Sequence, residues 1–203
     1  MKKNKIGILY FLGVLFLIIA ITAVINTIYI DGVSGTLWLC YAGLFIIGIG
    51  ILLRKDYLII SQLVILAIPL LVWITDFLFY FFTGSQFLGI TDYFFTDGNL
   101  LGKIISLQHL FTIPLALYAL MRIPRTSFAA WKISIVQIFL FFLVSRLFSS
   151  PEKNINYVHR FAEYSFISAA WYPLFWFICF FAMIGVTNVV LRTLLSLSNK
   201  EIV

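Results

Sequence analysis

Five side chains that could take part in chemistry lie within apolar stretches of this 203-residue sequence: Cys40, Asp76, Ser106, His109 and Arg146. A thiol or hydroxyl becomes a useful nucleophile when a base lies within hydrogen-bond reach and a third group orients that base. Cys40 is one candidate nucleophile, and Ser106 is the other. His109 could be the base, and Asp76 could orient it. Arg146 could stabilise an oxyanion or hold a lipid phosphate.

Each of these residue types also has a purely structural interpretation. Asp76 could pair with a nearby cation at a wet helix end, and His109 could be a neutral core histidine bonded to one acceptor. Cys40 could be a small packing residue. Ser106 could bond back to a carbonyl of its own helix. Arg146 could extend its charge to the membrane surface or neutralise Asp76.

Three further residues, Trp73, Asp92 and His159, are candidates for contacting a substrate in the same region. Trp73 could instead be an aromatic residue of the membrane interface. A metal site built from His109, His159 and a carboxylate such as Glu163 is arithmetically feasible, but the sequence has no HExxH or CxxC spacing. We therefore expect no metal and no cofactor.

The composition restricts the class of protein. The chain is 63% hydrophobic and 11% charged, with a mean hydropathy of +1.07, whereas soluble domains are about 45–50% apolar and about 25% charged. This excludes a soluble domain, a disordered chain and a disulfide scaffold. It predicts an all-α polytopic membrane protein, in which the net charge of +6 reflects topology rather than binding of nucleic acid.

Apolar runs of about 20 residues predict six transmembrane helices in a single domain, residues 1–203. The expected helices cover about 6–28, 36–53, 57–82, 103–121, 128–148 and 168–196. The first is too long for the apolar region of a signal peptide, so we expect it to be retained. Glycine and polar residues predict a loop at 83–102 and a polar segment at 149–163.

The Lys and Arg residues predict the orientation. With the N-terminus in the cytoplasm, ten of them fall on the cytoplasmic side and four (Lys103, Arg146, Lys153 and Arg160) on the other. This asymmetry predicts six spans with both termini cytoplasmic, in the cell (inner) membrane. Residues 97 and 154 should then face outside.

This topology gathers the candidate residues at one depth. Asp76 lies about six residues before the outer end of its helix, and His109 lies about six residues after the outer start of the next. At 1.5 Å per residue, both are about 9 Å below the outer boundary. Ionisable side chains inside a membrane are costly and mark a functional site by default.

Two segments carry a resemblance to a known family. Leu37-Trp38-Leu39-Cys40-Tyr41 and the stretch from Ser106 through His109 to Pro114 resemble motifs of the androgen-induced six-helix membrane hydrolases and related transmembrane acyltransferases. The resemblance implies a six-helix bundle with Cys40 as nucleophile and His109 as the histidine. Trp38 stands where that family has a histidine.

Other stretches look similar to uncharacterised bacterial multi-pass proteins, a likeness that implies no function. They are Trp73-Ile74-Thr75-Asp76, Gly89-Ile90-Thr91-Asp92-Tyr93 and Asn154-Ile155-Asn156-Tyr157.

The sequence favours one function and leaves one alternative, with a metal-dependent intramembrane hydrolase as a weaker third. The first is a lipid hydrolase or acyltransferase at the outer leaflet, which needs Cys40 or Ser106 beside His109 in an open cavity. The second is a non-enzymatic transporter subunit or assembly factor that binds a lipid or partner through a dry, packed polar layer. The expected partners are membrane lipids, and a membrane protein or a second copy of the chain.

Overall fold

The computed structural model describes residues 2–96, 99–125, 129–161 and 167–200. The described part is built of helices and connecting segments, without a strand. In chain order the elements are α1 Lys2–Ile30, the 3₁₀ turn η1 Val33–Leu37, α2 Leu39–Leu52, α3 Asp56–Thr83, α4 Asp92–Thr96, α5 Leu100–Ser106, α6 Gln108–Leu120, α7 Ala130–Phe148, the 3₁₀ turn η2 Ile155–Tyr157 and α8 Tyr172–Lys200.

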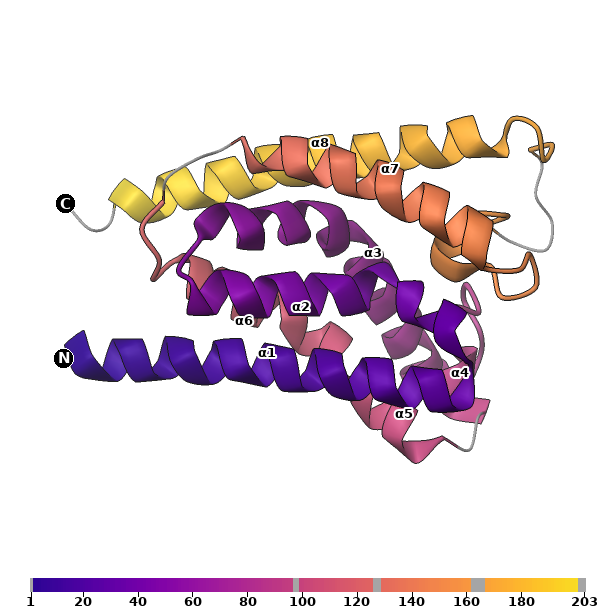
Figure 1. The fold of residues 1–203 in the computed structure, drawn as a ribbon, viewed down its shortest axis with the longest axis horizontal. Helices are drawn as coiled ribbons and strands as arrows, with labels where there is room; N and C mark the ends of the chain where they lie inside the picture. Colours follow the sequence, from indigo (N-terminus) through magenta and orange to yellow (C-terminus); the bar gives the residue numbers. More distant parts are fainter. Residues whose placement is uncertain (1, 97–98, 126–128, 162–166, 201–203) are drawn as a thin grey trace.

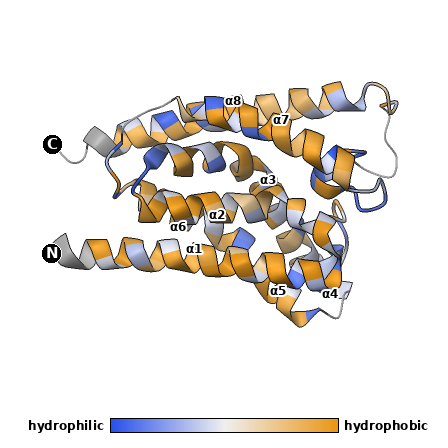
Figure 2. Cartoon of the chain, viewed as in Figure 1, coloured by the Kyte–Doolittle hydropathy of each residue, from blue (hydrophilic) through white to orange (hydrophobic). Residues whose placement is uncertain are grey.

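Long apolar helices make this a multi-span membrane protein. Ile6–Ile30, Asp56–Thr83, Leu100–Leu120, Ala130–Phe148 and Tyr172–Leu197 are long and apolar enough to cross a bilayer. The hydrophobic colouring covers most of their length, and hydrophilic residues gather in the connecting segments (Figure 2). The apolar α2 has 14 residues, shorter than the roughly 20 that a spanning helix needs.

Several expected helices have other bounds in the structure. The first, expected at 6–28, is Lys2–Ile30, and the last, expected at 168–196, is Tyr172–Lys200. The helix expected at 36–53 begins at Leu39, because Val33–Leu37 forms η1 and Trp38 has extended backbone. The helix expected at 103–121 begins at Leu100 and is divided at Leu107 into α5 and α6. The start expected at residue 128 lies outside the described residues.

The central helix is α3, which contacts α2, α6, α7 and α8. In Figure 1, α1 and α2 lie on one side of the bundle and α7 and α8 on the other. A reciprocal amide pair fixes α3 against α7: Gln62 Nε2 donates to Gln137 Oε1 at 2.8 Å, and Gln137 Nε2 donates to Gln62 Oε1 at 3.0 Å. Both side chains are buried, so in a membrane each amide satisfies the other.

Glycines set the close packing of α1 against α2. A Cβ atom added at Gly48 would lie 2.9 Å from Leu17 Cγ and 3.0 Å from the Gly13 carbonyl oxygen. A Cβ added at Gly13 would lie 2.7 Å from the Leu52 side chain. Small residues let two membrane helices approach closely. Here each helix contributes a glycine, Gly13 from α1 and Gly48 from α2.

The connecting segments gather at two ends of the bundle. Residues 31–38, 84–96 and 149–161 lie at one end, which we name the loop end. The turns at 53–55 and 121–125 lie at the other, the terminal end, together with the start of α1 and the last turns of α8 (Figure 1).

Candidate polar layer at the loop end

Asp76 of α3 holds the loop that follows its own helix. Its carboxylate accepts hydrogen bonds from the Leu88 amide at 2.6 Å, the Thr91 amide at 2.8 Å and the Thr91 hydroxyl at 2.8 Å. Gly84 and Gly89, at φ 67° and 72°, turn the chain back over the helix end, and such left-handed backbone favours glycine. Asp76 is 1% exposed, and the loop satisfies its charge.

Asp76 is bonded to this loop and not to either of the partners considered from the sequence. No hydrogen bond or ion pair in the described part of the chain joins it to His109 or to Arg146. Because the loop amides reach both carboxylate oxygens, neither a cation nor the imidazole is needed to satisfy them.

Trp73, one turn before Asp76, starts a chain of hydrogen bonds across three helices. Its indole Nε1 donates to Tyr93 Oη at 3.1 Å, and Tyr93 Oη donates to Ser106 Oγ at 3.1 Å. Burial raises the pKa of Tyr93, so the phenol stays protonated and remains a donor. Trp73 is buried at 6% exposure and joins α3, α4 and α5 rather than facing the membrane interface.

His109 of α6 packs against the same tryptophan. The imidazole and Trp73 ring centroids are 4.6 Å apart at 35°. Nδ1 lies 2.8 Å from the Ser106 carbonyl oxygen. A carbonyl only accepts, so Nδ1 carries the proton in the neutral ring and Nε2 keeps a free lone pair.

The two candidate nucleophiles are not paired with this base. The Ser106 hydroxyl accepts from Tyr93, and His109 contacts the Ser106 carbonyl instead of the hydroxyl. Cys40 is the second residue of α2 and is partly buried. Within the described residues its thiol has no hydrogen bond to His109 or Asp76, so the arrangement of nucleophile, base and orienting acid is not assembled.

Arg146 belongs to a second set of contacts, centred on the segment 149–161. Its guanidinium donates to the Val158 carbonyl at 2.6 Å. Asn156, in left-handed backbone at φ 54°, accepts from the Leu39 amide at 2.8 Å and donates to the Leu37 carbonyl at 2.7 Å. This side chain therefore satisfies the first amide of α2, 117 residues away in sequence.

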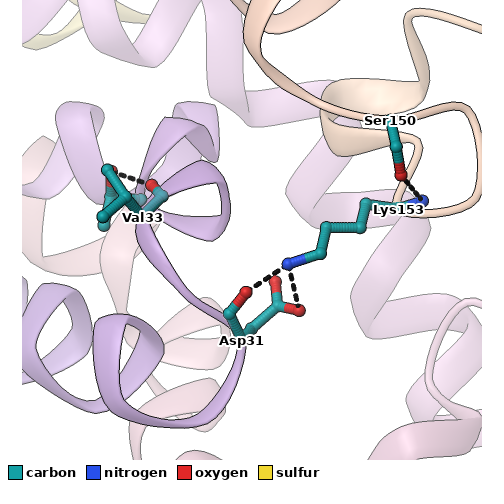
Figure 3. Close-up of polar contacts among 5 residues, drawn as sticks. Asp31, Val33, Ser150 and Lys153 are labelled. Carbon is teal, nitrogen blue, oxygen red and sulfur yellow. Dashed lines mark hydrogen bonds and ion pairs between the residues drawn. The ribbon is translucent and has the colours of Figure 1, made fainter.

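A surface ion pair adds to the attachment of this segment. Lys153 Nζ lies 2.9 Å from Asp31 Oδ1 and also donates to the Asp31 carbonyl (Figure 3). The Lys153 amide donates to Ser150 Oγ at 3.4 Å. The pair therefore fixes the segment to the end of α1.

The other two substrate-contact candidates have local partners. Asp92 Oδ2 accepts from Gln86 Nε2, and Asp92 Oδ1 is buried without a hydrogen bond. His159 Nε2 lies 3.2 Å from the Ser149 carbonyl, and its amide donates to Asn154 Oδ1 at 2.9 Å. Neither residue forms a hydrogen bond or an ion pair with His109 within the described residues.

Metal-ligating side chains do not converge in the described residues: no three His, Cys, Asp or Glu residues there are grouped so that they could hold an ion. Glu163 and Asp97 lie outside those residues.

Sequence reasoning missed the residues that complete the layer. Thr91 and Tyr93 supply partners of Asp76, Trp73 and Ser106, and Asn156 joins the segment 149–161 to the start of α2. Thr91 and Tyr93 lie in the expected loop at 83–102, and Asn156 lies in the expected polar segment at 149–163. Thr91 lies in the stretch Gly89–Tyr93, named above for a likeness that implies no function, and no spacing rule indicated that its amide and hydroxyl would contact Asp76.

Comparison with known protein families, with curated proteins and with solved structures finds no match. The fold defines a helical multi-span membrane protein, and any more specific function must be argued from the site.

Proposed function

We propose that this protein is a non-enzymatic membrane protein, a transporter subunit or assembly factor, that binds a membrane-protein partner at its loop end. The supporting observation is that the polar side chains at the loop end bond to the loops themselves. Asp76 holds the loop at 88–91, and Tyr93 links Trp73 to Ser106. These groups fix loop shape and leave no assembled nucleophile. A surface whose loops are already fixed suits recognition of a protein partner, because its loops lose little conformational entropy on binding.

Exposed aromatic residues next to these loops offer the contact surface. Phe81, Phe82 and Phe87 are 63%, 77% and 56% exposed. Large aromatic side chains contribute strongly to protein interfaces. In this proposal the chain has six spans and both termini in the cytoplasm of the cell membrane, so the loop end faces outside.

Site-specific photocrosslinking in cells tests the partner. A photoreactive amino acid at Phe87 should give a discrete protein adduct, and the same group at Val190, an exposed position on α8, should not. Asp76→Asn should weaken the Phe87 adduct because it loosens the loop. Adducts to lipid alone, or identical protein adducts from both positions, would contradict the proposal.

A lipid hydrolase or acyltransferase at the same layer is the second candidate. The observation that favours it is His109, whose Nδ1 is fixed by the Ser106 carbonyl. The free Nε2 is then oriented to accept a proton, as a general base requires. The nucleophile would be Cys40 or Ser106 after a change of rotamer.

Competitive labelling with a lipid-like thiol electrophile separates the two candidates. We expect His109→Ala to leave the labelling rate of Cys40 unchanged, because no hydrogen bond joins the two side chains. Cys179, in the same sample, provides the internal reference. If Cys40 reacts faster than Cys179 and His109→Ala slows Cys40 specifically, the enzyme becomes the better interpretation.

A further inference from the structure

A pocket of about 230 Å³ lies between α1, α2 and α6. Its wall is formed by carbon atoms almost throughout, and no charged side chain of the described residues lines it. The apolar side chains that line it are Leu15, Phe16 and Ile19 of α1, Leu44 of α2, and Phe111 and Leu115 of α6. A pocket with such a wall suits hydrocarbon and offers no group that would hold a charged ligand.

The two polar side chains at this pocket, Gln108 and Thr112 of α6, bond to each other. The Thr112 hydroxyl donates to Gln108 Oε1 at 2.5 Å and lies 2.8 Å from the Gln108 carbonyl oxygen. Both side chains are buried, and Gln108 Nε2 is enclosed by the protein. Their polar atoms therefore add almost nothing to the pocket surface, and an occupant would contact carbon atoms.

The pocket is continuous with the surface that faces lipid. Phe16 and Leu44 lie at its base and are buried, whereas Phe111 is 56% exposed. The other lining side chains that are partly exposed are Leu15, Ile19 and Leu115. Because α1 and the α5–α6 span are long apolar helices, their exposed side chains contact acyl chains in the bilayer. Lipid therefore borders the pocket directly.

The pocket lies at the depth of the bilayer centre. Phe111 is one residue from the centre of the span Leu100–Leu120, and Phe16 is two residues from the centre of Ile6–Ile30. At about 1.5 Å per residue, both lie within about 3 Å of the centre along their helix axes. Since the hydrocarbon core is about 30 Å thick, the headgroups are about 15 Å away. The part of a phospholipid that reaches this depth is the methyl end of an acyl chain.

We propose that this pocket holds the methyl-terminal part of one acyl chain of a bilayer phospholipid. Apolar cavities of about 150 Å³ stay free of water and bind hydrocarbon, and this pocket is larger. Left empty, it would deprive the lining side chains of van der Waals contacts on one side. An acyl chain is the hydrocarbon that the bilayer presents at this depth. This inference does not depend on the function proposed for the loop end.

The test uses the full chain in phosphatidylcholine nanodiscs and two phosphatidylcholine probes. One carries a diazirine near the methyl end of an acyl chain, and the other carries it near the carboxyl end. Mass spectrometry locates the adducts. Val186, exposed near the centre of the α8 span, reports lipid at the same depth without a pocket. We expect the methyl-end probe to give at least about threefold more adducts at the pocket than around Val186, a ratio that corresponds to about 0.7 kcal/mol. The carboxyl-end probe should show no such excess.

Matched variants make the test specific. Leu115→Trp should fill the pocket from α6 and remove the excess of adducts, because the acyl chain can no longer enter. Leu15→Trp should have the same effect from α1. Val136→Trp, at an exposed position of α7 that does not line the pocket, is the control for a bulky substitution and should leave the excess unchanged.

Three results would overturn the proposal: equal labelling of the pocket and of the Val186 surface by the methyl-end probe, a greater excess with the carboxyl-end probe, or an excess that a folded tryptophan variant of the pocket retains. If Leu115→Trp fails to fold, Leu15→Trp decides the same question, because it fills the pocket from a different helix. All readouts compare two lipid-facing regions, so they are independent of partner binding at the loop end.

Discussion

A carboxylate buried in a membrane helix needs donors close by, and Asp76 finds three of them in the loop that follows its own helix. The depth argument from sequence placed Cys40, Asp76, Ser106, His109 and Arg146 in one layer. In the structure His109 bonds to the Ser106 carbonyl, whereas Arg146 bonds to Val158 in a separate set of contacts. The depth argument did not identify the partners of Asp76, because Leu88 and Thr91 reach Asp76 only through the turns at Gly84 and Gly89. Loop geometry of this kind is set by tertiary contacts and not by local pattern.

Substitution of Asp76 should therefore destabilise the loop end. Asp76→Leu leaves the buried Thr91 amide and the partly buried Leu88 amide without their acceptors and should cost about 3 kcal/mol, whereas Asp76→Asn keeps one acceptor and should cost about 1–2 kcal/mol. Thermal unfolding in detergent, together with limited proteolysis of the loop at 84–91, measures both effects.

The matched control is Asp31→Asn, which removes the charge from an exposed pair with Lys153. Exposed ion pairs contribute about 0–1 kcal/mol, so this change should be small. If Asp76→Leu lowers the stability no more than Asp31→Asn does, the Asp76 carboxylate lies at a hydrated helix end and does not stabilise the loop.

At the scale of elements, long apolar runs were predictable and their interruptions were not. The helix expected at 57–82 is observed at Asp56–Thr83, since the charged turn before it and Gly84 after it mark both ends. The start of α2 at Leu39 was not predictable, because Asn156 satisfies its first amide from far along the chain. The break at Leu107 was not predicted either, although the polar residues Ser106 and Gln108 flank it.

The packing of α1 against α2 gives a prediction at this scale. Gly48→Ala should destabilise the protein by about 1–3 kcal/mol, the usual effect of overpacking, because the new methyl group would meet Leu17 and the Gly13 carbonyl. Gly185→Ala is the matched control, since a Cβ there has no neighbour within 4 Å. Thermal unfolding of the two variants side by side provides the comparison. Equal stability of the two variants would show that α1 and α2 do not depend on this contact.

At the scale of the whole molecule, the two ends of the bundle differ in the charged residues of their connecting segments. Arg54, Lys55, Arg122 and Arg125 lie at the terminal end, and the loop end carries the layer around Asp76 and the segment around Asn156. Lys and Arg bias a membrane protein so that the richer side stays in the cytoplasm. The first helix, α1, begins at the end that carries those four cations, and the last helix, α8, ends there (Figure 1). This arrangement suits an even number of membrane crossings.

This arrangement predicts the accessibility of single cysteines to a membrane-impermeant maleimide in intact cells. In a background with Cys40→Ser and Cys179→Ser, Glu152→Cys and Ser85→Cys should be labelled from outside, since both positions are exposed at the loop end. Lys55→Cys, exposed in the turn between α2 and α3, should be labelled only after the cells are permeabilised. Labelling of Lys55→Cys but not Glu152→Cys in intact cells would reverse the orientation and place the polar layer at the cytoplasmic face. Labelling of Glu152→Cys and Ser85→Cys on opposite sides would instead contradict the six-span count, because α5, α6 and α7 would then not form two crossings between them.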